Sequence, residues 1–115
     1  MAPRKEVVGA AGFFALDIRA GRVVDVVDFS EARNPSWKIT VDFGPEIGHL
    51  RTGAQIKNYA RDDLLGRLVV GVINLGNKRI AGFTSEFLIL GTYDPDGTVR
   101  LLQVEPEVKP GAVVG

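Results

Sequence analysis

Alternation of apolar and polar residues along residues 37–43 is the feature that most constrains the fold. The segment reads WKITVDF, so every second side chain is apolar. A period of two places the apolar side chains on one face of a β-strand and the polar ones on the other. The sequence therefore predicts a strand with one buried and one solvent-exposed face, as in an antiparallel sheet or barrel.

Strand-like segments also precede and follow this one, and helical signals are few. Apolar, β-branched runs predict further strands at 18–29, 50–56, 68–74, 86–92 and 98–102. Gly21 is expected to let the long first strand bend. Short helical turns are predicted at 61–65, closed by Gly66, and at 13–17. The pattern predicts an all-β fold, either a small antiparallel barrel or a sandwich, with a five-stranded OB barrel as one candidate.

Length and composition narrow the class of protein further. A chain of 115 residues predicts a single domain, with residues 1–12 as a flexible segment or an N-terminal extension. There is no cysteine, which excludes disulfides, thiolate zinc sites and cysteine nucleophiles. We find no signal peptide and no apolar run near the ~18 residues of a membrane span. We therefore predict a cytoplasmic protein without membrane insertion.

The charge is balanced overall but unevenly distributed. The formal net charge is zero, which by itself argues against strong nonspecific binding to nucleic acid. Residues 33–79 nevertheless hold eight basic residues against four acidic ones, whereas residues 80–115 hold two against five. This distribution allows a basic face on a neutral protein, and scattered surface charge is the alternative.

Residues that would carry catalysis are scarce. The only histidine, His49, lies in a glycine-rich loop, and one histidine without cysteine does not make a transition-metal site. None of the serines stands in a nucleophile-elbow motif. We therefore predict a protein that is not an enzyme and that carries no metal or cofactor.

Several short motifs, in a specific order, resemble one known family. Residues 16–24 read LDIRAGRVV, residues 29–44 read FSEARNPSWKITVDFG, and residues 78–86 read KRIAGFTSE. In order and spacing these motifs resemble the tRNA-binding-domain family, which includes C-terminal domains of methionyl-tRNA synthetases and small stand-alone proteins. The motif at 33–38, RNPSWK, is typical of the export-related CsaA chaperones of that family. Ala81 stands where the synthetase type carries an arginine, which also favours the CsaA type.

The resemblance implies both a fold and a function. The implied fold is an OB-fold five-stranded Greek-key barrel with short helices and terminal extensions that help to build a homodimer. The implied function is that of a dimeric chaperone binding unfolded or precursor polypeptides in protein export, with capacity to bind tRNA or other structured RNA. The alternative is a stand-alone tRNA-binding accessory protein without a chaperone role.

Basic and polar residues near the middle of the chain form the predicted site. OB folds bind ligands on one barrel face and its flanking loops, and RNA binders combine cations with hydrogen-bonding and stacking groups there. The predicted RNA contacts are Arg33, Lys38, Asn74, Lys78, Arg79 and Ser85. Phe83 and Glu86 are the predicted peptide contacts, with burial as the alternative for Phe83. Trp37 is expected to pack in the core, and a solvated loop is the alternative for the whole set.

Overall fold

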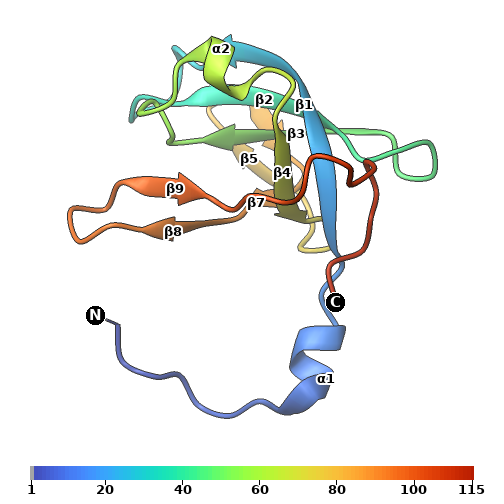
Figure 1. Cartoon of the computed structure of the whole chain (residues 1–115). Helices are drawn as coiled ribbons and strands as arrows, with labels where there is room; N and C mark the ends of the chain where they lie inside the picture. The colour runs from blue at the N-terminus through green and yellow to red at the C-terminus, as the bar shows by residue number, and fades with distance from the viewer. Residues whose placement is uncertain (1) are drawn as a thin grey trace.

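The structure is a computed structural model that describes residues 2–115. A long curved strand, β1 (Ile18–Asp28), lies along one side of the barrel in Figure 1, and shorter strands pair with both of its edges. The helices are α1 (Gly9–Phe14) and α2 (Arg61–Leu64). The strands are β1 (Ile18–Asp28), β2 (Trp37–Asp42), β3 (His49–Ala54), β4 (Leu68–Val72), β5 (Lys78–Ile80), β6 (Phe83–Ser85), β7 (Leu88–Ile89), β8 (Gly91–Tyr93) and β9 (Val99–Leu101).

Five of these strands form a nearly closed antiparallel barrel. Their order is β3-β2-β1-β4-β7, and the hairpins β5–β6 and β8–β9 form two further small sheets. The gap between β3 and the chain entering β7 is bridged by hydrogen bonds. The amide of Glu86 donates to the carbonyl of Arg51 at 2.7 Å, and Thr52 Oγ1 donates to the carbonyl of Phe87 at 2.8 Å. The molecule has an OB fold, as predicted.

The alternating segment forms the central layer of the core. Ile39, Val41 and Phe43 are at most 1% exposed, whereas the polar residues between them reach solvent in part. Gly21 is needed for a reason other than the predicted bend. A Cβ atom there would lie 2.5 Å from Cγ1 of Val41 and 2.8 Å from the ring of Phe43. The core therefore leaves no space for a side chain at this position of β1.

Three predicted segments differ in the structure. The predicted strand 86–92 is divided between β7 and β8, which belong to different sheets. The division falls at Leu90, whose amide donates to the carbonyl of Val70 while its carbonyl accepts from Leu102. As a result the β8–β9 hairpin projects from the barrel (Figure 1). Lys78 and Arg79, predicted in a loop, lie on β5. The N-terminal helix occupies Gly9–Phe14 rather than 13–17.

Helix α1 stands apart from the barrel (Figure 1). None of its residues is buried, and Phe14 is 74% exposed. Neither helix in residues 2–115 is long and apolar enough to cross a membrane.

Candidate functional site

The hairpin β5–β6 carries two of the predicted cations. Its two-residue turn consists of Ala81 and Gly82, with φ values of 48° and 79°. Positive φ at both positions is the geometry of a type I′ turn, which matches the twist of a two-stranded hairpin. The register places Arg79 opposite Thr84, and Arg79 donates to the Thr84 hydroxyl at 3.3 Å. Because Lys78 and Arg79 are neighbours on β5, their side chains point to opposite faces of this hairpin.

A row of residues across four strands connects this hairpin with β2. Lys38 on β2 lies opposite Gly53 on β3, and the amide of Gly53 donates to Oγ of Ser85 at 2.9 Å. Ser85 on β6 lies opposite Lys78 on β5. The fold thus places Lys38 and Lys78, which are far apart in the sequence, on one wall of the barrel. Arg51, two residues before Gly53 on β3, lies on the same face, and we name Lys38, Arg51 and Lys78 the cationic wall.

Two cations of this wall lie against aromatic rings. We name Phe29, Lys38, Arg51 and Phe83 the cation–aromatic cluster. Nζ of Lys38 lies 5.0 Å from the ring centre of Phe29 and 5.4 Å from that of Phe83. Cζ of Arg51 lies 4.6 Å from the Phe83 ring centre. These distances allow cation–π attraction, which holds the charges in place while their outer sides stay accessible.

Arg51 was not among the residues predicted from the sequence. A signal for it was a charged residue within the predicted strand 50–56, because such a side chain faces solvent; in the structure it lies opposite Thr40. Arg33, by contrast, was predicted and lies exposed in the loop between β1 and β2. Within residues 2–115 its side chain makes no hydrogen bond or ion pair.

Phe83 is only 5% exposed, so burial, the alternative for this residue, is what the structure shows. Its ring packs against that of Phe29 with the centres 5.2 Å apart. Phe83 therefore does not offer the open apolar surface that a direct peptide contact needs; it supports the cations above it.

Three predicted polar contacts already have partners within the barrel. Oδ1 of Asn74 accepts from the amide of Asp17, and its Nδ2 donates to the carbonyl of Ala15, both at 2.8 Å. Oγ of Ser85 accepts from Gly53, and Oε1 of Glu86 accepts from the amide of Arg51 at 3.0 Å. Asn74 thus fixes the chain that enters β1, while the other two help to close the barrel.

Lys38 forms an ion pair with an acidic neighbour. Its Nζ lies 3.0 Å from Oε1 of Glu31, which is exposed. A hydrogen bond from the Ser30 hydroxyl, followed by the one from Lys38, holds the pKa of Glu31 below its ordinary value. The carboxylate is therefore ionised at neutral pH, and it competes with any anion that approaches Lys38.

We predict that Glu31→Gln tightens tRNA binding, by up to about fivefold, since an exposed ion pair holds its cation only weakly. The slope of log affinity against log salt should also become steeper, because one more cation meets a phosphate. Fluorescence anisotropy over a salt series measures both. Glu105→Gln makes the same charge change in the C-terminal segment and should have a smaller effect; equal effects would show that only net charge matters.

An apolar hollow of about 310 Å³ lies beside the cationic residues. We name it the apolar hollow; its lining residues are Thr52, Gly53, Leu75, Gly76, Asn77, Lys78, Ile80, Ser85, Phe87 and Leu88. Three of its large apolar side chains reach solvent: Leu75 is 54%, Ile80 40% and Leu88 51% exposed. No such patch was predicted from the sequence, although a leucine within the polar segment NLGN was a signal for it.

Residues 2–115 contain no group of three histidine or acidic side chains that would hold a metal ion. His49 is exposed, and its Nε2 lies 4.0 Å from a carboxylate oxygen of Asp42. The features that the structure does build are a cationic wall and an apolar hollow next to it. The fold places this domain in the OB-fold class, whose members commonly bind ligands on one barrel face and its flanking loops.

Comparison with known sequences places the domain within that class. Residues 18–113 match the family described as "Putative tRNA binding domain". The chain belongs to this family, which confirms the resemblance seen in the motifs.

Two solved structures are similar over nearly the whole chain. A CsaA chaperone protein from Picrophilus torridus is 38% identical, with a TM-score of 0.90, and the match covers 95% of this chain and all of that one. A chaperone CsaA from Bacillus anthracis is 40% identical, with a TM-score of 0.89, over 96% of this chain and all of that one.

Curated relatives include much longer proteins. A methionine–tRNA ligase from Thermococcus onnurineus is 39% identical over 107 residues, which are 93% of this chain. The matched region is 14% of that ligase. The likeness therefore concerns one part of the ligase.

Proposed function

We propose that the protein is a dimeric chaperone that binds unfolded or precursor polypeptides in the cytoplasm and also binds tRNA. Residues 1–115 act in this proposal as one OB-fold domain, with residues 1–12 as an N-terminal extension. The observation that carries the proposal is the position of the apolar hollow directly beside the cationic wall. The likeness to two CsaA chaperones over their whole length supports it.

The apolar hollow is the proposed polypeptide site. Leu75, Ile80 and Leu88 offer apolar surface, and Lys78 lies at the same hollow. An exposed apolar patch with polar groups at its edge is typical of a surface that binds protein segments. Glu86 belongs to the proposed peptide-binding region as a support, because it holds the backbone of β3 in place.

The cationic wall is the proposed RNA site. Phosphate contacts are assigned to Arg33, Lys38, Lys78 and Arg79, as predicted from the sequence, and to Arg51. RNA affinity of this kind rests on neutralising phosphates with basic side chains and depends on salt. Asn74 and Ser85 contribute by fixing the segments on which the cations stand.

The segment 8–16, which overlaps the N-terminal extension and contains α1, is proposed to pair two copies of the chain. Val8, Phe13, Phe14 and Leu16 expose between 40% and 76% of their surface. Apolar side chains this exposed gain free energy when a second copy covers them. The proposed dimer therefore forms through α1 and the residues next to it.

We expect Phe14→Asp to give a monomer at micromolar concentration. Burying an unpaired carboxylate in an apolar interface should raise the dissociation constant on the order of a hundredfold. Analytical ultracentrifugation over a concentration series measures the change. Val27→Asp on β1, where the side chain is 49% exposed, is the matched control and should leave the dimer intact. Dimers that survive Phe14→Asp unchanged would place the interface elsewhere.

One pair of assays tests the proposed function. The protein should suppress aggregation of a chemically unfolded client protein, and it should bind tRNA with an affinity that falls as salt rises. A protein that leaves client aggregation unchanged at a molar excess is not a chaperone. If it nevertheless binds tRNA, the alternative function of a stand-alone tRNA-binding accessory protein is the correct one. The cationic wall favours this alternative function, because tRNA binding through the wall does not require the apolar hollow.

A further inference from the structure

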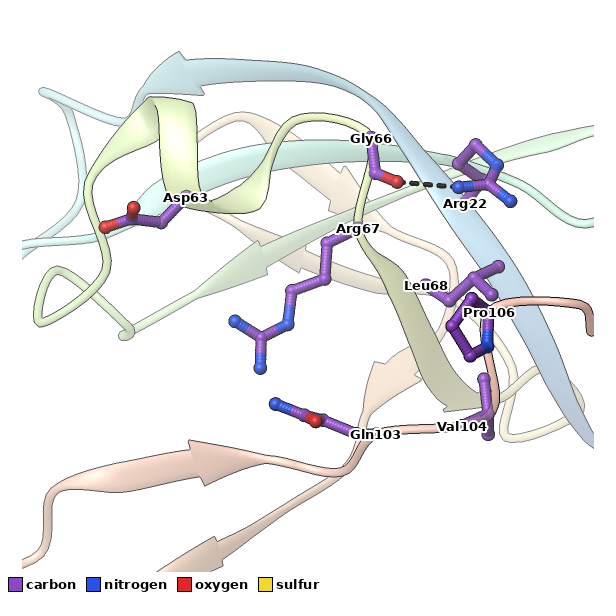
Figure 2. Close-up of a pocket in the computed structure, with 8 residues that line it drawn as sticks. All are labelled: Arg22, Asp63, Gly66, Arg67, Leu68, Gln103, Val104 and Pro106. Atoms are coloured by element: carbon purple, nitrogen blue, oxygen red, sulfur yellow. Dashed lines mark hydrogen bonds between the residues drawn. The ribbon is translucent and has the colours of Figure 1, made fainter.

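A second hollow contains two arginines that form no ion pair within residues 2–115. Its volume is about 360 Å³, and it shares no lining residue with the apolar hollow. We name it the arginine hollow; its lining residues are Arg22, Asp63, Gly66, Arg67, Leu68, Gln103, Val104 and Pro106 (Figure 2). The hollow therefore combines β1, the turn before β4 and the segment after β9.

Arg67 is held on an aromatic platform. Its Cζ lies 4.9 Å from the ring centre of Tyr59, and both residues are half-buried. Two hydrogen bonds fix Tyr59 in place. Its hydroxyl accepts from the amide of Leu101 at 3.1 Å, and its backbone carbonyl accepts from Nε1 of Trp37 at 3.0 Å. The guanidinium of Arg67 is thus placed before any ligand arrives, which lowers the entropic cost of binding.

Arg22 is fixed on the opposite side of the hollow. One terminal nitrogen of its guanidinium donates to the carbonyl of Gly66 at 2.7 Å, the bond that Figure 2 marks with a dashed line. The turn that carries Gly66 is itself tied to β1, because the amide of Gly66 donates to the carbonyl of Val23. The remaining N–H donors of Arg22 have no partner within residues 2–115.

The charges in the hollow are not balanced by the protein. Neither arginine forms an ion pair in residues 2–115, whereas Arg19, Lys38, Lys57, Arg61 and Arg100 each do. Asp63 is the only carboxylate of the lining, and its Oδ2 accepts from the amide of Ala60 at 3.2 Å. Figure 2 shows this carboxylate pointing away from Arg22 and Arg67. The hollow thus offers guanidinium donors without a matching acceptor.

Other side chains that line the arginine hollow indicate which kind of hydrogen-bond acceptor a ligand would carry. The amide of Gln103 and the guanidinium of Arg67 face each other across the hollow (Figure 2). A carboxylate is planar and matches the forked donors of a guanidinium, and an amide N–H₂ adds a further donor. Leu68, Val104 and Pro106 form an apolar wall beside these donors. Glu105 and Glu107, on either side of Pro106, disfavour a polyanion such as an RNA backbone.

We propose that the arginine hollow binds a single carboxylate, namely the C-terminal carboxylate of a polypeptide whose last side chain rests on the apolar wall. The proposal deepens the proposed function, since it rests on a polypeptide as the partner. It assigns the carboxylate contacts to Arg67 and Gln103, which face each other, whereas Figure 2 shows the Arg22 guanidinium beside the Gly66 carbonyl and away from that pair. Binding would require a free C-terminus, so the site would distinguish chain ends from internal segments.

The test uses the full chain and two peptides that differ in one group. Acetyl-Ala-Ala-Leu with a free carboxylate is titrated by calorimetry, and the same peptide with a C-terminal amide is the comparison. The acid should bind at least about tenfold more tightly, because hydrogen bonds to charged groups are worth about 1.5–3 kcal/mol and 1.4 kcal/mol is tenfold. Acetate is then added in increasing amounts to the complex with the acid peptide, and displacement of the peptide supports the proposal.

Two variants test the assignment. Arg67→Gln should bring the affinity for the acid down to that for the amide. Gln103→Glu should do the same by repulsion, and because Gln103 is exposed, this change leaves the fold intact. Arg100→Gln removes a cation from the β8–β9 hairpin and should leave the preference for the acid unchanged. Equal binding of acid and amide by the unaltered protein would overturn the proposal.

Aggregation and tRNA-binding assays on the same samples separate this proposal from the proposed function. If the unaltered protein suppresses client aggregation but binds acid and amide equally, only the carboxylate site is wrong. If it prefers the acid but suppresses no aggregation, the site stands and the chaperone function fails. If Arg67→Gln weakens tRNA binding while neither peptide binds, the arginine hollow serves RNA and the proposal is overturned.

Discussion

Reversing the charge of the β5–β6 hairpin, with Lys78→Glu and Arg79→Glu together, is expected to weaken tRNA binding by at least about a hundredfold. Each residue is assigned one phosphate contact, and hydrogen bonds to a charged partner are worth about 1.5–3 kcal/mol, so removing both gives a factor of this size. The slope of log affinity against log salt should also fall, by roughly 0.7–0.9 for each phosphate that is no longer neutralised. Filter binding or anisotropy between low and moderate salt measures both quantities.

The control has the same change in net charge at a different place. Arg100→Glu with Lys109→Glu alters the β8–β9 hairpin and the C-terminal segment, away from the cationic wall. Both double variants should remain folded, since exposed substitutions usually change the free energy of unfolding by less than about 0.5 kcal/mol. An equal loss of tRNA affinity in the two variants would mean that net charge alone governs binding and that the cationic wall is not the site.

Because Lys78 also lines the apolar hollow, the two proposed ligands should interfere with each other. Excess tRNA should displace a bound peptide from the unaltered protein, and the effect should disappear in the Lys78→Glu, Arg79→Glu variant. Simultaneous binding of both ligands at full affinity would place the polypeptide somewhere other than the apolar hollow.

Strand periodicity predicted an all-β fold, with barrel and sandwich both open, because it depends only on the order of residues along one segment. Residues 37–43 alternate so regularly that the buried face of β2 follows directly from them. The convergence of Lys38 and Lys78 is less local, since it depends on the register of β2 with β3 and on the Gly53–Ser85 hydrogen bond. The resemblance to an OB-fold family supplied that topology, whereas no pattern within the sequence did.

The roles of individual polar residues were harder to predict from the sequence. Asn74 and Ser85 have side chains suited to RNA contacts, yet in the fold they bind backbone groups of distant segments. Tertiary packing decides which hydrogen-bond partner such a side chain finds, and neither composition nor residue spacing reports on that packing. The apolar hollow was missed for the same reason, because Leu75 and Leu88 come together only when the barrel closes.

Replacing these two leucines by glutamine is expected to weaken the binding of an apolar polypeptide by about tenfold or more. Leu75 and Leu88 are each about half exposed. Full burial of a leucine is worth roughly 1.5–3 kcal/mol, so covering the remaining half of two side chains contributes about that amount in total. Glutamine preserves the size and adds no charge, so tRNA binding should stay unchanged. Val24→Gln with Val27→Gln, on the exposed face of β1, is the matched control. Calorimetric titration with one unfolded client peptide measures the dissociation constant for the unaltered protein, the leucine variant and the valine control. If the leucine variant binds the peptide as tightly as the valine control does, the apolar hollow is not the polypeptide site.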